Sequence, residues 1–100
     1  MKAQSRRRER GADTLRELVG ETVVVDLRSS YVCLGTLVGL DETYLHLKNA
    51  DLHDLRDTTT TRENYVVFSH RTGIKRNRKR LLVVRADVVA ISRLEDVADE

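Results

Sequence analysis

The feature that most constrains the fold is a change in hydrophobic period at Gly20. Before it, Leu15, Leu18 and Val19 are spaced as on one side of a short helix. After it, Val23, Val25 and Leu27 recur at every second position, which is the period of a β-strand with one buried face. The sequence therefore predicts a helix over residues 13–19, capped by Asp13 and ended by Gly20, followed directly by a sheet.

Further segments of strand length follow at short intervals. Residues 31–38 form a second predicted strand, in which Gly35 is typical of a sharp bend at a barrel corner. Residues 43–50 alternate again, and residues 81–84 and 88–91 are two apolar runs joined by a tight connection. Short strands joined by tight turns favour a mainly β protein built as a small antiparallel barrel of five strands.

The segment 51–80 interrupts this pattern and is predicted to be an insertion between the third and fourth strands. Thr60 and Glu63 fit a capping box, and Gly73 fits a helix stop, so residues 60–72 are predicted to form a helix that projects from the barrel. The run from Tyr65 to Phe68 is also compatible with a strand. We favour the helix because both of its end signals agree.

Charge is distributed unevenly along a chain whose formal net charge is only +2. Residues 1–11 are predicted to be a disordered basic arm, residues 12–95 the folded domain, and residues 96–100 an acidic tail. Basic runs on a small domain are typical of nucleic-acid binding, although a solvated surface is the simpler interpretation of each run alone. The cations of the two runs are Arg6, Arg7, Arg8, Arg10, Lys75, Arg76, Arg78, Lys79 and Arg80.

Other aspects of composition narrow the class of protein. Aromatic residues make up only 4% of the chain, so the core is modest, which favours stabilisation by self-association. Cys33 is the single cysteine, and Met1 is followed by polar and basic residues without an apolar stretch. These features predict a cytoplasmic protein with no disulfide, no secretory signal and no membrane span.

The motif from Gly20 to Asp41 resembles the first motif of the Sm and Sm-like proteins, the family that includes bacterial Hfq. The matching residues are Gly20, Val23, Val25, Leu27, Arg28, Gly35, Leu37 and Asp41. The segment from Val84 to Ile91 resembles the second motif, with Arg85 at its basic position. The resemblance covers residues 13–50 and 81–93 and implies a bent five-stranded barrel that assembles into homo-oligomeric rings of six or seven subunits, in a family that binds RNA.

The chain differs from the family at the base-binding pocket. The resemblance implies a stacking residue where this chain has Thr43, a base-reading asparagine at Leu45, and a glycine at Ala86. Threonine has no π face and leucine cannot hydrogen-bond a base edge. Arg85 alone keeps the family's residue type, and its pairing with Asp87 within the tight connection is an equally weighted structural interpretation.

These observations predict a ring-forming, RNA-binding module that is not an enzyme and holds neither cofactor nor metal. RNA would be bound mainly through phosphates by the two basic runs, together with Arg85, and with little sequence preference. A protein-interaction scaffold ring that has lost the base pocket is the alternative. His53 lies between Asp51 and Asp54, but this spacing matches no zinc motif, and no nucleophile motif or glycine-rich phosphate loop is present.

Overall fold

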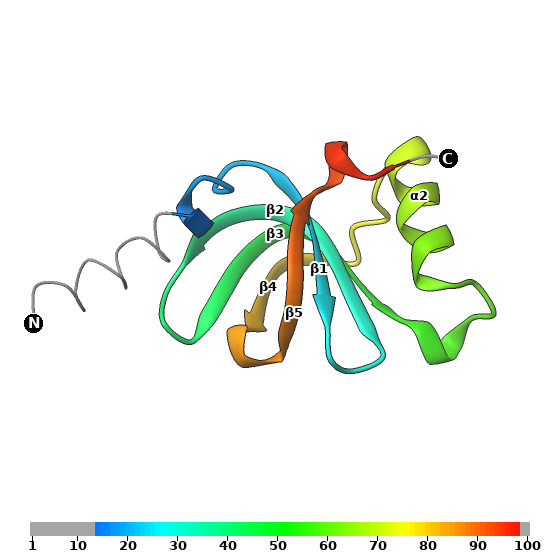
Figure 1. Ribbon diagram of the computed structural model, residues 1–100, viewed down its shortest axis with the longest axis horizontal. Helices are drawn as coiled ribbons and strands as arrows, with labels where there is room; N and C mark the ends of the chain where they lie inside the picture. Colours follow the sequence, from blue (N-terminus) through cyan, green and yellow to red (C-terminus); the bar gives the residue numbers. More distant parts are fainter. Residues whose placement is uncertain (1–13, 99–100) are drawn as a thin grey trace, which may run out of the picture.

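The chain forms a strongly bent, five-stranded antiparallel sheet in the order β4-β3-β2-β1-β5 (Figure 1). The computed structural model describes residues 14–98. The strands are β1 (Thr22–Leu27), β2 (Tyr31–Leu40), β3 (Tyr44–Asp54), β4 (Arg78–Val84) and β5 (Val88–Arg93). The predicted mainly β fold is confirmed, including its five strands and antiparallel pairing.

Residues 14–16 are helical and lead into a turn that ends at Gly20. The amides of Leu18 and Val19 donate to the carbonyls of Leu15 and Arg16. Gly20 has φ +92°, a conformation that glycine adopts without the steric cost of a Cβ. The predicted short helix is confirmed over these residues, whereas its cap at Asp13 and the basic arm lie outside the described residues.

The interior of the barrel is filled by the alternating positions that the period predicts. Val23, Val25, Leu37 and Leu47 belong to this main core, and Leu18 packs against it from the N-terminal turn. Gly35 lies where β2 crosses β3 closely: a Cβ placed on it would lie 2.9 Å from the Cβ of Ala50. The predicted bend at Gly35 coincides with a register shift between Leu34 and Thr36 in the β2–β3 pair.

A second, smaller core lies between the sheet and α2 (Arg62–Thr72), the helix of the connection from β3 to β4 (Figure 1). Tyr65 and Val66 of α2 pack against Val24, Val32 and Leu34 of β1 and β2. The predicted helix is therefore confirmed and the strand interpretation of residues 65–68 is wrong. The helix does not simply project from the barrel, because this apolar contact holds it on the sheet.

Two predicted boundaries differ from those observed. β3 continues to Asp54, which pairs with Tyr31, and β4 begins at Arg78, which pairs with Ala50. The connection between them therefore spans residues 55–77 rather than 51–80. The helix cap is Thr61, whose Oγ1 accepts from the Asn64 amide at 3.2 Å, and not Thr60. Gly73 ends the helix as predicted, with its amide donating to the Ser69 carbonyl.

Three short 3-10 turns complete the chain. η1 (Leu55–Asp57) follows β3, η2 (Arg85–Asp87) joins β4 to β5, and η3 (Leu94–Asp96) follows β5. Leu94 and Val97 pack against the smaller core, so the segment after β5 closes over the α2 side of the sheet. Across residues 14–98, no helix is long and apolar enough to span a membrane.

Candidate nucleic-acid interface

The second basic run lies along one free edge of the sheet. Lys75 and Arg76 belong to the connection before β4, whereas Arg78, Lys79 and Arg80 are residues of β4 itself. All five side chains are exposed. Within the described part of the chain, none of them forms an ion pair. These five cations are therefore available to bind an anion from solution.

β3 adds a cation to this run. Lys48 pairs directly with Arg80 across the β3–β4 ladder, and it is exposed. Like charges directly opposite each other destabilise a strand pair. The two cations therefore repel each other, and a bound anion would relieve this repulsion. Lys48 is far from the basic run in the sequence, and only the register of the β3–β4 pair places it beside Arg80.

The turn between β2 and β3 is organised around the Asp41 carboxylate. Its Oδ1 accepts from the amides of Thr43 (2.8 Å) and Tyr44 (2.7 Å), and its Oδ2 lies 2.9 Å from Nε2 of His46. The hydrogen bond with His46, followed by those from the two amides, lowers the pKa of Asp41 to about 2. A charged carboxylate therefore fixes the shape of this turn.

Arg85 lies against the same turn. Its Nη1 donates to the carbonyl oxygen of Asp41 at 2.6 Å, and its amide donates to the carbonyl of Thr43 at 2.9 Å. Asp87 instead accepts from the Ser29 hydroxyl at 3.3 Å and, through its carbonyl, from the Arg28 amide. Pairing of Arg85 with Asp87, one of the two interpretations of this segment, is wrong, because the guanidinium bonds Asp41 in the turn between β2 and β3.

The fold thus brings Asp41, Thr43 and Arg85 together, as the family resemblance implies. Leu45 is only 2% exposed and belongs to the barrel core, and Tyr44 lies on the opposite side of β3. No aromatic ring from positions 43 or 45 faces Arg85, and one donor of Arg85 is already used by a backbone carbonyl. This corner is a structural clamp between two turns more than a base-reading pocket.

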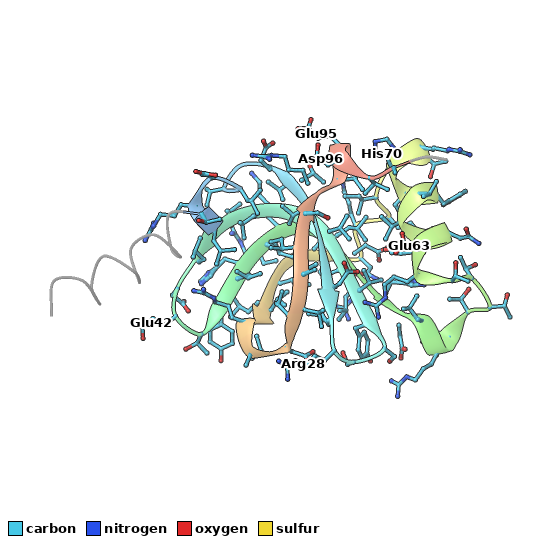
Figure 2. All side chains as sticks on the ribbon, viewed as in Figure 1. Arg28, Glu42, Glu63, His70, Glu95 and Asp96 are labelled. Carbon is cyan, nitrogen blue, oxygen red and sulfur yellow. The ribbon has the colours of Figure 1, made fainter. Side chains whose placement is uncertain are left out.

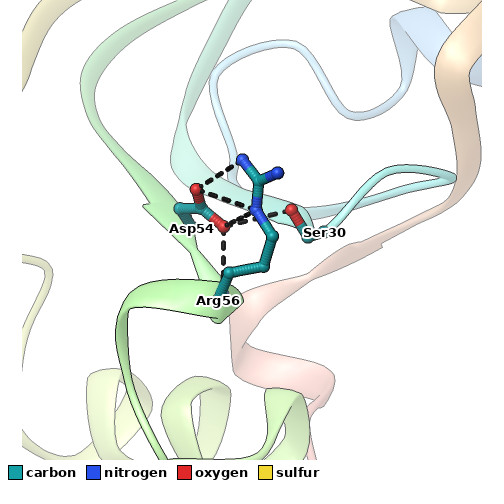
Figure 3. Close-up of polar contacts among 3 residues, drawn as sticks. All are labelled: Ser30, Asp54 and Arg56. Atoms are coloured by element: carbon teal, nitrogen blue, oxygen red, sulfur yellow. Dashed lines mark hydrogen bonds and ion pairs between the residues drawn. The ribbon is translucent and has the colours of Figure 1, made fainter.

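The start of the β3–β4 connection is tied to the opposite turn by a second charged group (Figure 3). Arg56 donates to both oxygens of Asp54, at 2.8 to 3.2 Å, and the Ser30 hydroxyl donates to Asp54 Oδ1 at 3.0 Å. These bonds, those from Arg56 first, hold the pKa of Asp54 well below its usual range. Asp54 therefore has a structural role, and residues 14–98 contain no cluster of three or more potential metal ligands.

The candidate cations Arg6, Arg7, Arg8 and Arg10 lie outside the described residues. Within residues 14–98, the candidate interface consists of the exposed β4 edge together with Lys48. The contact between Arg85 and the Asp41 turn lies at the other end of β4. Pairing of Tyr44 with Val84 places the clamp beside this end of β4, whereas Arg78 lies at its start.

No family model matches the sequence, and no curated protein matches it. Solved structures do match. The Sm protein of Pyrococcus abyssii, in complex with a uridine heptamer, has a TM-score of 0.56 and 18% identity, and covers 81% of this chain and 93% of its own. A heptameric archaeal Sm protein has a TM-score of 0.51 and 22% identity, with coverage of 81% and 96%.

A chain of the NatC complex bound to CoA is similar to the same degree, with a TM-score of 0.53 and 19% identity over 84% of this chain and 94% of that one. At these identities the likeness establishes the fold. This chain has the fold of the Sm and Sm-like proteins, as its Gly20–Asp41 motif predicts. The same fold occurs in an RNA-bound protein and within a protein complex, so function has to be argued from the residues.

We expect the Asp41 turn to lose its contribution to stability in acid. A carboxylate whose pKa is lower in the folded state stabilises the fold above its unfolded value of 3.8, and this contribution is lost as pH falls through about 2. Asp41→Asn should therefore lower the melting temperature at neutral pH, and its difference from wild type should shrink between pH 4 and pH 2. Thermal unfolding followed by circular dichroism measures this. Glu42→Gln, an exposed change in the same turn (Figure 2), is the control; a constant Asp41→Asn effect down to pH 2 would contradict the account.

Proposed function

We propose that this chain is a ring-forming, Sm-like module that binds single-stranded RNA mainly through its phosphates and is not an enzyme. The observation that carries the proposal is the free edge of β4, where unpaired cations and exposed apolar side chains occur on one strand. A cytoplasmic location and independence of membranes remain predictions.

Ring assembly is supported by the two strands that end the sheet. Among residues 14–98, β4 pairs only with β3 and β5 pairs only with β1, so both strands present an unpaired edge. Exposed large apolar side chains occur on both: Leu82 (56% exposed) and Val84 (47%) on β4, and Val89 (65%) on β5. Pairing β4 of one subunit with β5 of the next would satisfy these edges and cover these side chains. A closed ring of six or seven copies then leaves no free edge.

RNA binding is supported by the distribution of charge. A ring would repeat Lys48 and the run from Lys75 to Arg80 in every subunit, so that weak phosphate contacts add up through avidity. Arginine suits this role because its forked donors bind phosphate oxygens. The basic arm, with Arg6, Arg7, Arg8 and Arg10, would add flexible contacts. Arg85 is assigned a minor part, since it already donates to Asp41.

The alternative is a scaffold ring that binds protein rather than RNA. It is favoured by the absence of a stacking residue at Thr43, by the burial of Leu45 and by the likeness to a chain of the NatC complex. The two proposals differ in whether the basic edge of β4 binds RNA. Measuring RNA binding at low salt distinguishes between them.

Replacing Arg76, Arg78 and Arg80 with glutamine is expected to weaken binding of oligo-U and oligo-A by similar factors. Phosphate contacts release counterions, so log K falls with log salt by about 0.7 for each single-strand phosphate neutralised, and the variant should show a flatter slope. Fluorescence anisotropy across a salt series measures both quantities. Arg85→Ala serves as the comparison and should change affinity little.

Binding that is insensitive to salt, selective for uridine and abolished by Arg85→Ala would contradict the phosphate-binding proposal. It would show instead that RNA is recognised by the family's base pocket at Arg85. A ring that binds neither oligonucleotide at low salt would leave the scaffold as the function.

A further inference from the structure

A cleft of about 840 Å³ lies between α2, the end of β3 and the connection 73–77. In Figure 1 the yellow segment after α2 runs between the helix and the barrel. Residues of this segment, Gly73, Ile74, Lys75 and Asn77, line the cleft. Its volume is that of a small-molecule site. None of its lining residues belongs to the Asp41 and Arg85 corner or to the positions where the family motif lies.

One wall of the cleft is aromatic. Asn64, Phe68 and Thr72 are four residues apart along α2 and so share one face of the helix, and all three line the cleft. Phe68 is 56% exposed, which leaves its ring open to a ligand. Below it, the Tyr65 ring stacks on His53 of β3, with centroids 4.0 Å apart and planes inclined by 6°.

The other walls are polar, and most of their hydrogen-bonding groups are already paired within the fold. Asp51 is buried, and its carboxylate accepts from the Tyr65 hydroxyl, so its charge is engaged at the floor. Nε2 of His53 is a buried side-chain nitrogen with no hydrogen-bond partner within the described part of the chain. The amide group of Asn77 bonds both the N–H and the C=O of Leu52, at 2.9 and 3.1 Å, and so holds the connection in place.

The rim of the cleft joins the basic run. Lys75 lines the cleft and is followed directly by Arg76, Arg78, Lys79 and Arg80. A strand whose phosphates follow this run would bring one nucleotide to the mouth of the cleft. An exposed ring, the side-chain amide of the exposed Asn64, and a cation at the rim are groups that recognise an unstacked nucleobase next to a phosphate.

We propose that the cleft between α2 and residues 73–77 holds one nucleobase of single-stranded RNA, stacked on Phe68, with its phosphate at Lys75. This inference rests on the proposed RNA binding and adds a base contact to it. The insertion would then supply the stacking surface that Thr43 no longer provides in the Asp41 corner.

The test compares an RNA of about 12 nucleotides, within the range of single-strand site sizes, with an abasic strand that has the same number of phosphates. Phe68→Ala should weaken binding of the RNA by roughly 5- to 150-fold, the effect of one lost stack, without changing its salt slope. The same variant should bind the abasic strand as wild type does. Phe68→Tyr should retain affinity, and Asn64→Ala should weaken only the RNA.

His70→Ala is the matched control, because His70 is exposed on the same helix but does not line the cleft (Figure 2). Melting temperatures of all variants show whether they fold. Equal binding of the RNA by wild type and Phe68→Ala would overturn the base site and leave phosphate binding intact. An equal loss of affinity for both strands would also overturn the base site, because the abasic strand has no base to stack. Absence of binding by wild type at low salt would overturn the base site and the proposed function together.

Discussion

Gly35→Ala is expected to destabilise the barrel by about 1–3 kcal/mol or more. The added Cβ would lie 2.9 Å from the Cβ of Ala50, 3.0 Å from its Cα and 3.2 Å from the carbonyl oxygen of Lys48. These atoms belong to the backbone, or lie next to it, and cannot rotate away, so β3 would have to move from β2 at the bend. Urea unfolding measures the loss as a lower midpoint.

Gly39→Ala is the matched control for this change. Gly39 belongs to the same strand, and a Cβ placed there meets no atom within 4 Å. We expect its unfolding midpoint to stay close to that of wild type. Equal destabilisation by both substitutions would show that the cost comes from alanine in β2 and not from the close approach of the two strands.

The second large effect is expected at the free edges of the sheet. Val89→Lys puts a charge on β5 at a side chain that is 65% exposed, and lysine on an edge strand is a device that prevents strand pairing between chains. The substitution should leave the single subunit folded and convert the ring to monomers. Analytical ultracentrifugation reports the mass, and circular dichroism reports the fold.

Val38→Lys supplies the control, because Val38 is 39% exposed on β2, an interior strand of the sheet. It adds the same charge without touching either edge. An unchanged mass for Val89→Lys would mean that the subunits do not associate through β5, and loss of assembly in Val38→Lys would place the contact on the sheet face instead.

Local sequence patterns were sufficient for the barrel and insufficient for its boundaries. The period of two predicted the buried face of Val23, Val25 and Leu27, which lies in the main core, and a glycine within a strand marked the bend. The end of β3 was missed because Asp51 and His53 are polar residues in a strand. Asp51 is buried with its carboxylate accepting a hydrogen bond from the hydroxyl of Tyr65, which lies on α2, 14 residues further along the chain. A pattern within one strand contains no information on that contact.

The same limit applies at the helix start and at the candidate site. Thr58 to Thr61 are four consecutive threonines, and the capping box favoured Thr60, whereas the backbone places Thr61 at the cap. The Arg85 bond to Asp41 joins residues 44 positions apart, and the sequence suggested the nearby Asp87 instead. The basic run was visible in the sequence, but Lys48 joins it only through pairing of β3 with β4.

Assembly of this chain into a ring through its β4 and β5 edges can be measured by multi-angle light scattering of the purified protein at micromolar concentration. We expect a single species of six or seven times the 11.5 kDa mass of one chain. A uniform species of 11.5 kDa would contradict the ring and, with it, the avidity on which the proposed RNA binding depends.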